Sequence, residues 1–338
     1  MNRDRFAEIT SRYNGLRVAV IGDFCLDRYL EIDPSRAEVS IETGLPVHNV
    51  IRVRAQPGGA GTILCNLAAL GIGELWPVGF CGDDGEGYEL RRALAALPGV
   101  RLDHFLTTGE RRTFTYCKPL VLDAGKPPRE LNRLDSKNWT PTPVAVADKL
   151  AAAVRTCGDG MDAILVLDQV DLANTGVITP PVLAEISALA GRNNDLQILA
   201  DSRRGLRDFP RIGYKMNRDE LAAMTGTAAR LPLAQVQIAA AQLAKSTGNP
   251  VFVTLSEEGI VGADAAGEVA HCPARPVCGA IDIVGAGDAV AANLATALAA
   301  GASMSEALEL AMSAASVVVH QLGTTGAASV AQLRAKLF

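Results

Sequence analysis

Arg17-Val18-Ala19-Val20-Ile21-Gly22 is the first of four short apolar stretches that decide the fold class of this 338-residue chain. The others are residues 163–168, 196–201 and 251–255. Apolar runs that do not alternate with polar residues suit strands covered on both faces, as in a parallel sheet. We therefore expect an α/β fold with a mostly parallel central sheet.

Longer stretches with helical periodicity separate or follow these runs. They cover residues 61–70, 181–190, 234–245, 288–300 and 305–321. The last one is expected to begin with Ser305 as its N-cap and to stop before Gly323. The alternation of strand and helix predicts helices on both faces of the sheet, which makes a three-layer sandwich.

Two segments do not follow this alternation of strand and helix. Residues about 30–56 and about 105–135 have β-branched residues, prolines and some alternation, which predict extended strands. We expect them to form a small β-sheet inserted at two places into a single domain covering residues 1–338. This sheet could be a lid over the site, an oligomer interface or a purely structural flap.

Composition restricts the class of partner. The net charge is −5, and 49% of residues are hydrophobic. Without an excess of basic residues, a nucleic-acid partner is not expected. The polar N-terminus does not resemble a signal peptide, and the apolar stretch at 289–300 is too short to span a membrane. We expect a cytoplasmic protein whose seven scattered cysteines stay reduced.

Three of the apolar runs end at a carboxylate: Asp23, Asp168 and Asp201. In open α/β sheets, ligands bind at the carboxyl edge of the strands. These residues are therefore candidates for a binding site, although each could instead cap the helix or turn that follows.

The sharpest local motif is Gly285-Ala286-Gly287-Asp288 at the start of a helical run. Small residues at a helix N-terminus let backbone N–H groups approach an anion, and the helix dipole favours negative charge there. A carboxylate in that turn suits a base that takes a proton from a hydroxyl while the N–H groups hold a phosphoryl group. A plain helix start remains the alternative. The chain has neither a P-loop motif nor the glycine fingerprint of dinucleotide-binding enzymes.

Further motifs occur in an order that is similar to the ribokinase-like (PfkB) family of carbohydrate kinases, and especially to heptose-7-phosphate kinases. They are Gly22-Asp23 with Asp27, Pro57-Gly58-Gly59-Ala60, Gly82-Asp83-Asp84, Leu131-Asn132-Arg133-Leu134-Asp135, Asn217-Arg218-Asp219-Glu220, Thr254 to Gly259, and Gly323-Thr324-Thr325. The resemblance covers nearly the whole chain and implies a ribokinase-like sandwich with a β-sheet lid.

The resemblance also implies roles. Asp288 would be the catalytic base, and Gly285, Ala286 and Gly287 would form the anion hole. The sugar pocket would contain Asp23, Asp27, Gly58, Gly59 and Thr62, and the nucleotide would lie at Asn217, Thr254, Ser256, Gly259 and Ser313. Glu220 would bind Mg²⁺ through water. The implied reaction transfers the γ-phosphoryl group of ATP to a sugar or sugar phosphate, and relatives dimerise through the lid.

The chain departs from the heptose kinases mainly on the sugar side. Thr62 replaces an asparagine, Val284 a threonine and Ser313 an asparagine, and a lysine is lost where Asp171 is gained. Heptose 7-phosphate is the nearest guess for the acceptor, with Arg36, Arg112 or Arg133 as possible phosphate ligands. Arg203 or Arg204 could neutralise phosphate charge or simply lie in a solvated turn.

Two alternatives to a kinase follow from the sequence. The changed sugar side suggests a catalytically weak sugar or nucleotide sensor that kept the fold. A nicotinamide-dependent dehydrogenase would also use a parallel sheet, but the glycine fingerprint of that class is missing.

Overall fold

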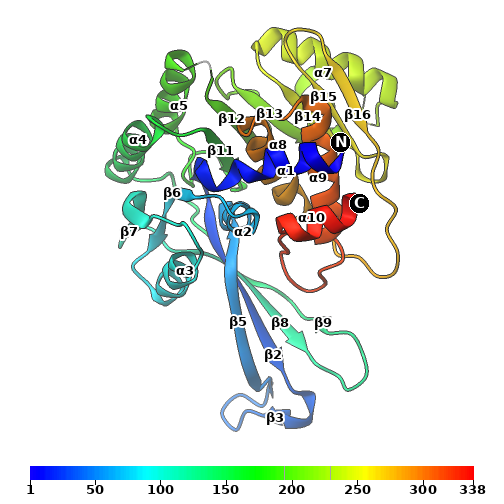
Figure 1. Cartoon of the computed structure of the whole chain (residues 1–338). Helices are drawn as coiled ribbons and strands as arrows, with labels where there is room; N and C mark the ends of the chain where they lie inside the picture. The colour runs from blue at the N-terminus through cyan, green and yellow to red at the C-terminus, as the bar shows by residue number, and fades with distance from the viewer. Residues whose placement is uncertain (194, 229) are drawn as a thin grey trace.

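The computed structural model describes residues 1–193, 195–228 and 230–338. They form a large sheet between helical layers and a smaller sheet that projects away from it (Figure 1). The large sheet has the strand order β16-β15-β14-β13-β12-β11-β1-β6-β7. Its strands are β1 (Arg17–Gly22), β6 (Glu74–Gly82), β7 (Phe105–Thr108), β11 (Ala163–Asp168), β12 (Gln197–Ser202), β13 (Gly213–Asn217), β14 (Val251–Thr254), β15 (Ile260–Ala263) and β16 (Val269–Cys272).

The sheet is parallel from β7 to β14, and β15 and β16 are antiparallel additions at one edge. The apolar runs become the buried strands β1, β11, β12 and β14, as the sequence predicts. β1 and β11 have the predicted bounds, and β12 is shifted by one residue. Parallel pairing places the carboxyl ends of β1, β11, β12 and β13 at a common edge, where polar side chains collect.

Two helical layers cover the sheet. The first contains α2 and α8, with α9 packed on α8, and it shares one core with Val18, Val20 and Leu165. The second contains α4, α5 and α7, which share another core with Ile21, Val166 and other strand residues. The helices are α1 (Arg3–Ser11), α2 (Ala60–Leu70), α3 (Gly85–Ala95), α4 (Val144–Gly158), α5 (Pro180–Arg192), α6 (Arg218–Thr225), α7 (Leu233–Thr247), α8 (Ala286–Ala299), α9 (Met304–Val318) and α10 (Val330–Leu337).

The predicted start of α9 is wrong. Ser303, not Ser305, is the N-cap: its side chain accepts from the N–H of Glu306, whose carboxylate accepts from the N–H of Ser303. This reciprocal capping box needs an acidic residue three positions after the cap, and only Ser303 has Glu306 there. α9 also ends at Val318 rather than 321, because the N–H of Gln321 donates to Val318 O in a tight turn.

The smaller sheet, called the lid below, has the order β10-β8-β2-β5. Its strands are β2 (Phe24–Ile32), β5 (Val50–Gly59), β8 (Phe114–Val121) and β10 (Leu134–Ser136), with β9 (Arg129–Glu130) beside β8 and a small ribbon, β3 (Glu38–Val39) and β4 (Pro46–Val47), at the tip. Two inserted segments do form this sheet, but the predicted limits of 30–56 and 105–135 are displaced. The first strand starts at Phe24, and residues 105–108 pair with β6 in the large sheet.

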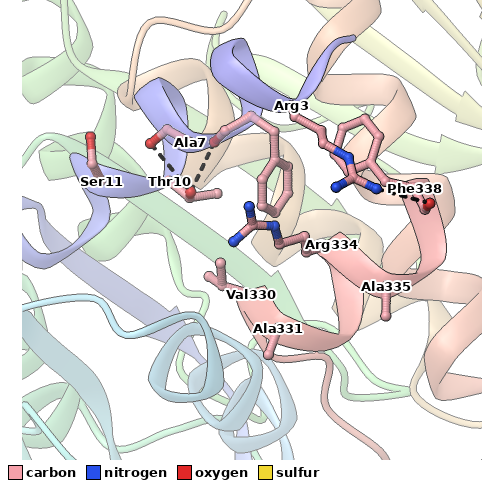
Figure 2. A pocket seen from close by; sticks show the side chains of 10 residues that line it. Arg3, Ala7, Thr10, Ser11, Val330, Ala331, Arg334, Ala335 and Phe338 are labelled. Carbon is pink, nitrogen blue, oxygen red and sulfur yellow. Dashed lines mark hydrogen bonds between the residues drawn. The ribbon is translucent and has the colours of Figure 1, made fainter.

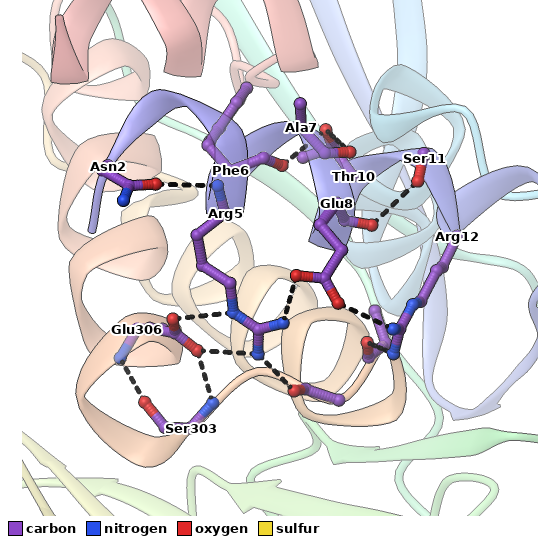
Figure 3. Close-up of polar contacts among 12 residues, drawn as sticks. Asn2, Arg5, Phe6, Ala7, Glu8, Thr10, Ser11, Arg12, Ser303 and Glu306 are labelled. Atoms are coloured by element: carbon purple, nitrogen blue, oxygen red, sulfur yellow. Dashed lines mark hydrogen bonds and ion pairs between the residues drawn. The ribbon is translucent and has the colours of Figure 1, made fainter.

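The two ends of the chain lie close together (Figure 1). α1 packs beside α10, where the rings of Phe6 and Phe338 meet edge to face at 5.8 Å and Arg3 lies over Phe338 (Figure 2). Arg5 joins α1 to α9, because its guanidinium binds Glu306 and Gly301 O (Figure 3). α1 thus bridges the C-terminal helices, far from the carboxyl edge of the sheet.

Across the described ranges, the structure contains no helix with both the length and the apolar character needed to cross a membrane.

Candidate functional site

The Gly-Ala-Gly-Asp turn opens α8 at the carboxyl edge of the sheet. Gly285 is the N-cap with φ +82°, a left-handed conformation that glycine adopts without strain. Asp282 shapes the approach, because its carboxylate accepts from the N–H groups of Val284 and Gly323. The N–H of Ala286 donates to Ile283 O at 3.2 Å. The N–H groups of Gly287 and Asp288 lie in the first turn of the helix, where the helix itself provides no carbonyl oxygen to accept from them. The turn can therefore present N–H groups to an anion.

Lys215 lies directly behind this turn. An added Cβ at Gly287 would be 3.1 Å from Lys215 Nζ, and Nζ lies 2.6 Å from Asp201 Oδ2. Burial lowers the pKa of Lys215, but Asp201 and Asp288 outweigh this and raise it, so the ammonium stays charged. Sequence reasoning missed this residue. A lysine inside an apolar strand is its only signal, since lysine is rarely buried without a partner.

Asp288 itself is half-buried. Burial raises the pKa of its carboxyl to about 7, Lys215 lowers it, and Asp201 and Asp27 raise it further. A carboxyl poised near neutral pH can accept a proton and release it again, which is what general-base catalysis requires. The charge of Asp27 is thus close enough to Asp288 to influence the pKa of this carboxyl.

The predicted sugar residues lie around the base of the lid. Asp27 is buried, with Lys118 Nζ 3.4 Å from Oδ1. A Cβ at Gly58 would be 2.7 Å from Asp27 Oδ2, so the glycine makes room for the carboxylate. Thr62 is buried in the first turn of α2; its Oγ1 has no partner, and its methyl group lies 3.5 Å from the Cβ position of Gly285. Thr62 thus packs against the Gly-Ala-Gly-Asp turn, whereas Gly58 and Asp27 contact each other at the base of the lid.

Asp23, which was predicted to line the sugar pocket, binds backbone N–H groups instead. Its two carboxylate oxygens accept from the N–H groups of Gln169 and Val177 at 2.8 and 2.7 Å. Burial raises its pKa to about 7, and repulsion from Asp168 adds to this. Asp23 therefore positions the loop after β11. Gly59, with φ +57° and its Cβ position 2.5 Å from Asp23 O, fixes the start of α2.

A cavity of about 500 Å³ opens on the other side of the turn. Three predicted nucleotide residues, Thr254, Ser256 and Gly259, line it together with Ala286 and Gly287. The rest of the wall is mainly apolar, from Val277, Ile281, Ile283, Val290, Met312, Ala315 and Val319. A largely apolar cavity that reaches the N-terminus of a helix has room for the base of a nucleotide, with the phosphates at the helix turn.

Ser313 does not reach this wall. Its Oγ donates to Glu309 O and accepts from Arg275 Nε. One turn further along α9, Ser316 does line the cavity, and its buried Oγ has no partner. The periodicity of the helix could have shown this, since Met312, Ala315, Ser316 and Val319 share a face.

Asn217 and Glu220 form a reciprocal capping box at the start of α6. Glu220 Oε2 accepts from the N–H of Asn217 at 2.7 Å, and burial raises the pKa of this carboxyl. Asn217 pairs with Thr254 of the neighbouring strand, and Thr254 lines the cavity of about 500 Å³. In the described part of the chain, no three Asp, Glu, His or Cys side chains converge tightly enough to hold a metal directly.

The arginines predicted as possible phosphate ligands lie in different parts of the structure. Arg36 pairs with Asp33 near the tip of the lid, and the N–H of Arg112 is bound by Asn138. Arg133 instead lies over the ring of Tyr116 at 5.1 Å, near Asp27. Arg204 binds the buried carboxylate of Asp168 at 2.7 Å, whereas Arg203 binds Asp171.

Solved structures with the same architecture have been determined for sugar kinases. The chain superimposes on phosphofructokinase-2 from Escherichia coli in complex with substrates and products with a TM-score of 0.71 and 18% identity, covering 95% of this chain and 97% of that one. Ribokinase from Arabidopsis thaliana complexed with ribose and ATP gives 0.67 and 19%, covering 95% and 98%. The fold is therefore the ribokinase-like α/β sandwich.

Sequence comparison identifies the family. Residues 17–331 match the model of the pfkB family of carbohydrate kinases, and the chain belongs to this family. The bifunctional protein HldE of Rhodospirillum rubrum is 34% identical over 327 residues, 94% of this chain and 62% of that protein. HldE of Gluconacetobacter diazotrophicus is 32% identical over 329 residues, 96% and 64%. The chain thus spans somewhat less than two thirds of the length of these relatives.

Proposed function

We propose that the chain transfers the γ-phosphoryl group of ATP to a hydroxyl of a sugar or sugar phosphate, with Asp288 as the base. One observation carries the proposal: Asp288 and Lys215 meet at the helix turn that separates the nucleotide cavity from Asp27 and Thr62. A carboxylate with a pKa near 7 faces the acceptor side, while a buried cation and N–H groups face the phosphoryl side.

In this reaction the acceptor hydroxyl attacks the γ-phosphorus as its proton passes to an Asp288 carboxylate oxygen. The bond between the γ-phosphorus and the bridging oxygen breaks, and ADP leaves with the electron pair. The free N–H groups of the turn and the Lys215 ammonium stabilise the charge on the transferring group. Most of the rate enhancement comes from positioning, since little covalent chemistry is left to the protein.

Glu220 is our candidate for holding Mg²⁺ through water, together with Asn217. Mg²⁺ keeps several waters in such sites and uses one or two carboxylates plus substrate phosphates, which fits a site without a tight cluster of ligands. Glu220 has one oxygen committed to the N–H of Asn217 and a second one to offer. When bound, the ion would neutralise phosphate charge; the residues themselves fix where it could lie.

The acceptor is proposed to be a sugar or sugar phosphate, with heptose 7-phosphate as the first compound to test because the motifs resemble those of heptose-7-phosphate kinases. We also propose that the 338 residues act as one catalytic domain and that two copies associate through the lid. Exposed apolar side chains on the lid support the second point, namely Val39, Ile41, Leu45, Val50, Ile51, Val53 and Leu134. Replacing Ile41 and Ile51 with aspartate should yield a monomer in sedimentation velocity.

The experiment that tests the function is an ATP-turnover assay across matched sugars and sugar phosphates, with the product identified by mass spectrometry. A phosphorylated sugar supports the kinase. Binding of both ligands without any phosphorylated product would favour the second candidate, a sensor that kept the fold. The sensor remains the second candidate because Thr62 and Asp171 differ from the residues of the heptose kinases.

A further inference from the structure

Residues 273–284, called the cavity loop below, form an irregular segment between β16 and the helix turn that opens α8 (Figure 1). The loop makes one wall of the cavity of about 500 Å³, to which it contributes Ala274, Arg275, Pro276, Val277, Ile281 and Ile283. Val277, Ile281 and Ile283 are nevertheless 47%, 45% and 73% exposed, so packing holds this wall only weakly. Its position therefore depends on the hydrogen bonds that fasten it to the neighbouring helices.

Arg275 fastens the first part of the cavity loop to two helices. Its Nε donates to Ser313 Oγ at 3.0 Å and its Nη1 to Lys336 O at 3.2 Å, while Nη2 lies 3.8 Å from Glu309 Oε1. Ser313 and Glu309 belong to α9, and Lys336 belongs to α10. A planar guanidinium serves several partners at once in fixed directions. Arg275 thus orients the loop, and it keeps two of these partners if the Ser313 hydroxyl is removed.

A second fastening lies in the middle of the cavity loop, at Cys278. The N–H of Cys278 donates to His320 Nε2 at 3.4 Å, and His320 Nδ1 lies 2.6 Å from Ser316 O. Because a carbonyl oxygen can only accept, Nδ1 carries the hydrogen and Nε2 is left to accept from the loop. His320 stands outside the lining of the cavity. It can therefore act on a bound nucleotide only through the loop.

The two ends of the cavity loop are held by the backbone. Gly259 has φ +95°, and a Cβ there would lie 2.0 Å from Cys272 O, so this glycine lets the chain that enters the loop pass close by. At the other end, the N–H of Asp282 donates to Val319 O at 2.8 Å. The span between these ends is the part that the two side-chain fastenings control.

We propose that Arg275 and His320 are positioning residues for the nucleotide, which hold the cavity loop in the conformation that receives the base. This inference rests on the proposed function, because it requires that the cavity takes a nucleotide. If the competent conformation is populated only in part, the apparent Kd rises by the inverse of the populated fraction. Saturating nucleotide restores that conformation. Loss of either fastening should therefore raise Kd and KM for the nucleotide and leave kcat nearly unchanged.

The first test measures ADP binding to the full chain by isothermal titration calorimetry. We expect Arg275→Met and His320→Phe each to raise the Kd for ADP about 10-fold, which corresponds to a competent fraction of about one tenth. Arg101→Met and His48→Phe, at exposed positions outside the cavity loop, are the matched controls and should leave this Kd unchanged. If the wild type binds ADP and either loop variant binds it equally well, the inference is overturned and the kinase proposal stands. A wild type that binds no ADP would overturn both.

A direct contact between Arg275 and the nucleotide is the main alternative, because Arg275 also lines the cavity. Adenosine is the second probe, since it has the base and no phosphate. A displaced wall should weaken the binding of ADP and adenosine by the same factor, whereas loss of an ion pair with a phosphate would weaken ADP alone. An effect of Arg275→Met that is confined to ADP would contradict positioning.

A general loss of stability is separated from positioning by hydrogen exchange and kinetics. In Arg275→Met and His320→Phe, the amides of residues 276–282 should exchange faster while those of α9 stay protected, and ADP should restore the protection. His320→Gln keeps an acceptor for the N–H of Cys278 and should remain close to the wild type. KM for ATP should rise with kcat unchanged within about twofold. Faster exchange throughout the chain with a lower kcat and an unchanged KM would show that the two residues only stabilise the fold.

Discussion

Lys215 Nζ lies 2.6 Å from Asp201 Oδ2, at the end of neighbouring parallel strands directly behind the turn that carries Asp288. This pair places a buried positive charge beside the Gly287 backbone. Asp201 keeps the lysine protonated and oriented, while Lys215 partly offsets the burial that raises the pKa of Asp288. The relationship connects phosphate binding with the protonation of the base.

Substituting Lys215 with methionine should therefore do two things. The kcat should fall by about 10²-fold or more because one charge-stabilising group is lost. The acid limb of the pH–rate profile should also move to higher pH, because removal of the cation raises the pKa of Asp288 further. The exposed Lys245→Met on α7 is the control. A fall in kcat without any displacement of the limb would show that Lys215 does not influence the base.

The wild-type pH profile gives a second prediction. Asp288 acts as a base only when ionised, and its pKa is raised to about 7 in the folded protein. The value of kcat/KM should thus rise with pH through about 7 and level off above it, since kcat/KM reports the free enzyme. An acid limb near pH 4 would mean that an ordinary, unperturbed carboxylate limits the reaction.

The contribution of Asp288 to the free energy of unfolding should fall as pH rises, whereas kcat/KM should increase. Asp288 binds its proton more tightly in the folded than in the unfolded chain, so its ionisation costs stability as pH rises from about 4 to about 7. Asp288→Asn removes that cost. We expect its Tm to exceed the wild-type value by more at pH 8 than at pH 5, measured by scanning calorimetry. Asp148→Asn, at an exposed position on α4, should show no such difference.

Two serines on α9 allow a direct test of the nucleotide cavity. Ser316 offers an unpaired, buried hydroxyl to the cavity, whereas the Ser313 hydroxyl is already bonded to Glu309 O and Arg275. Ser316→Ala should raise KM for ATP about 3- to 10-fold through the loss of one hydrogen bond. Ser313→Ala should leave that KM within twofold. If KM for ATP rises in Ser313→Ala and not in Ser316→Ala, Ser313 and not Ser316 contacts the nucleotide.

Sequence patterns predicted the parts of the fold that depend on local signals. Arg17–Gly22 and Ala163–Asp168 are continuous apolar runs, and burial on both faces leaves them no other role than central strands. The start of α9 was missed because Ser303 and Ser305 are both acceptable caps, and only the spacing to Glu306 distinguishes them. The lid limits were displaced because the apolar start of β2 looks like the end of β1.

The site was predictable where one motif contains its own chemistry, as at Asp288. Lys215 could not be assigned from sequence, since its role depends on the parallel pairing of β12 with β13, which brings Asp201 beside it. The same holds for Lys137 and Asp171, which are far apart in sequence and meet only because the lid folds back over the β11 loop. Contacts between distant segments carry no local pattern.

The central claim is that Asp288 is the base in phosphoryl transfer, and Asp288→Asn tests it most directly. The variant keeps the shape of the side chain and removes its basicity. With an acceptor identified by the turnover assay, we predict a fall in kcat of about 10²- to 10⁴-fold, with the Kd for ATP unchanged within about threefold. A variant that binds ATP normally and retains full kcat would contradict the account.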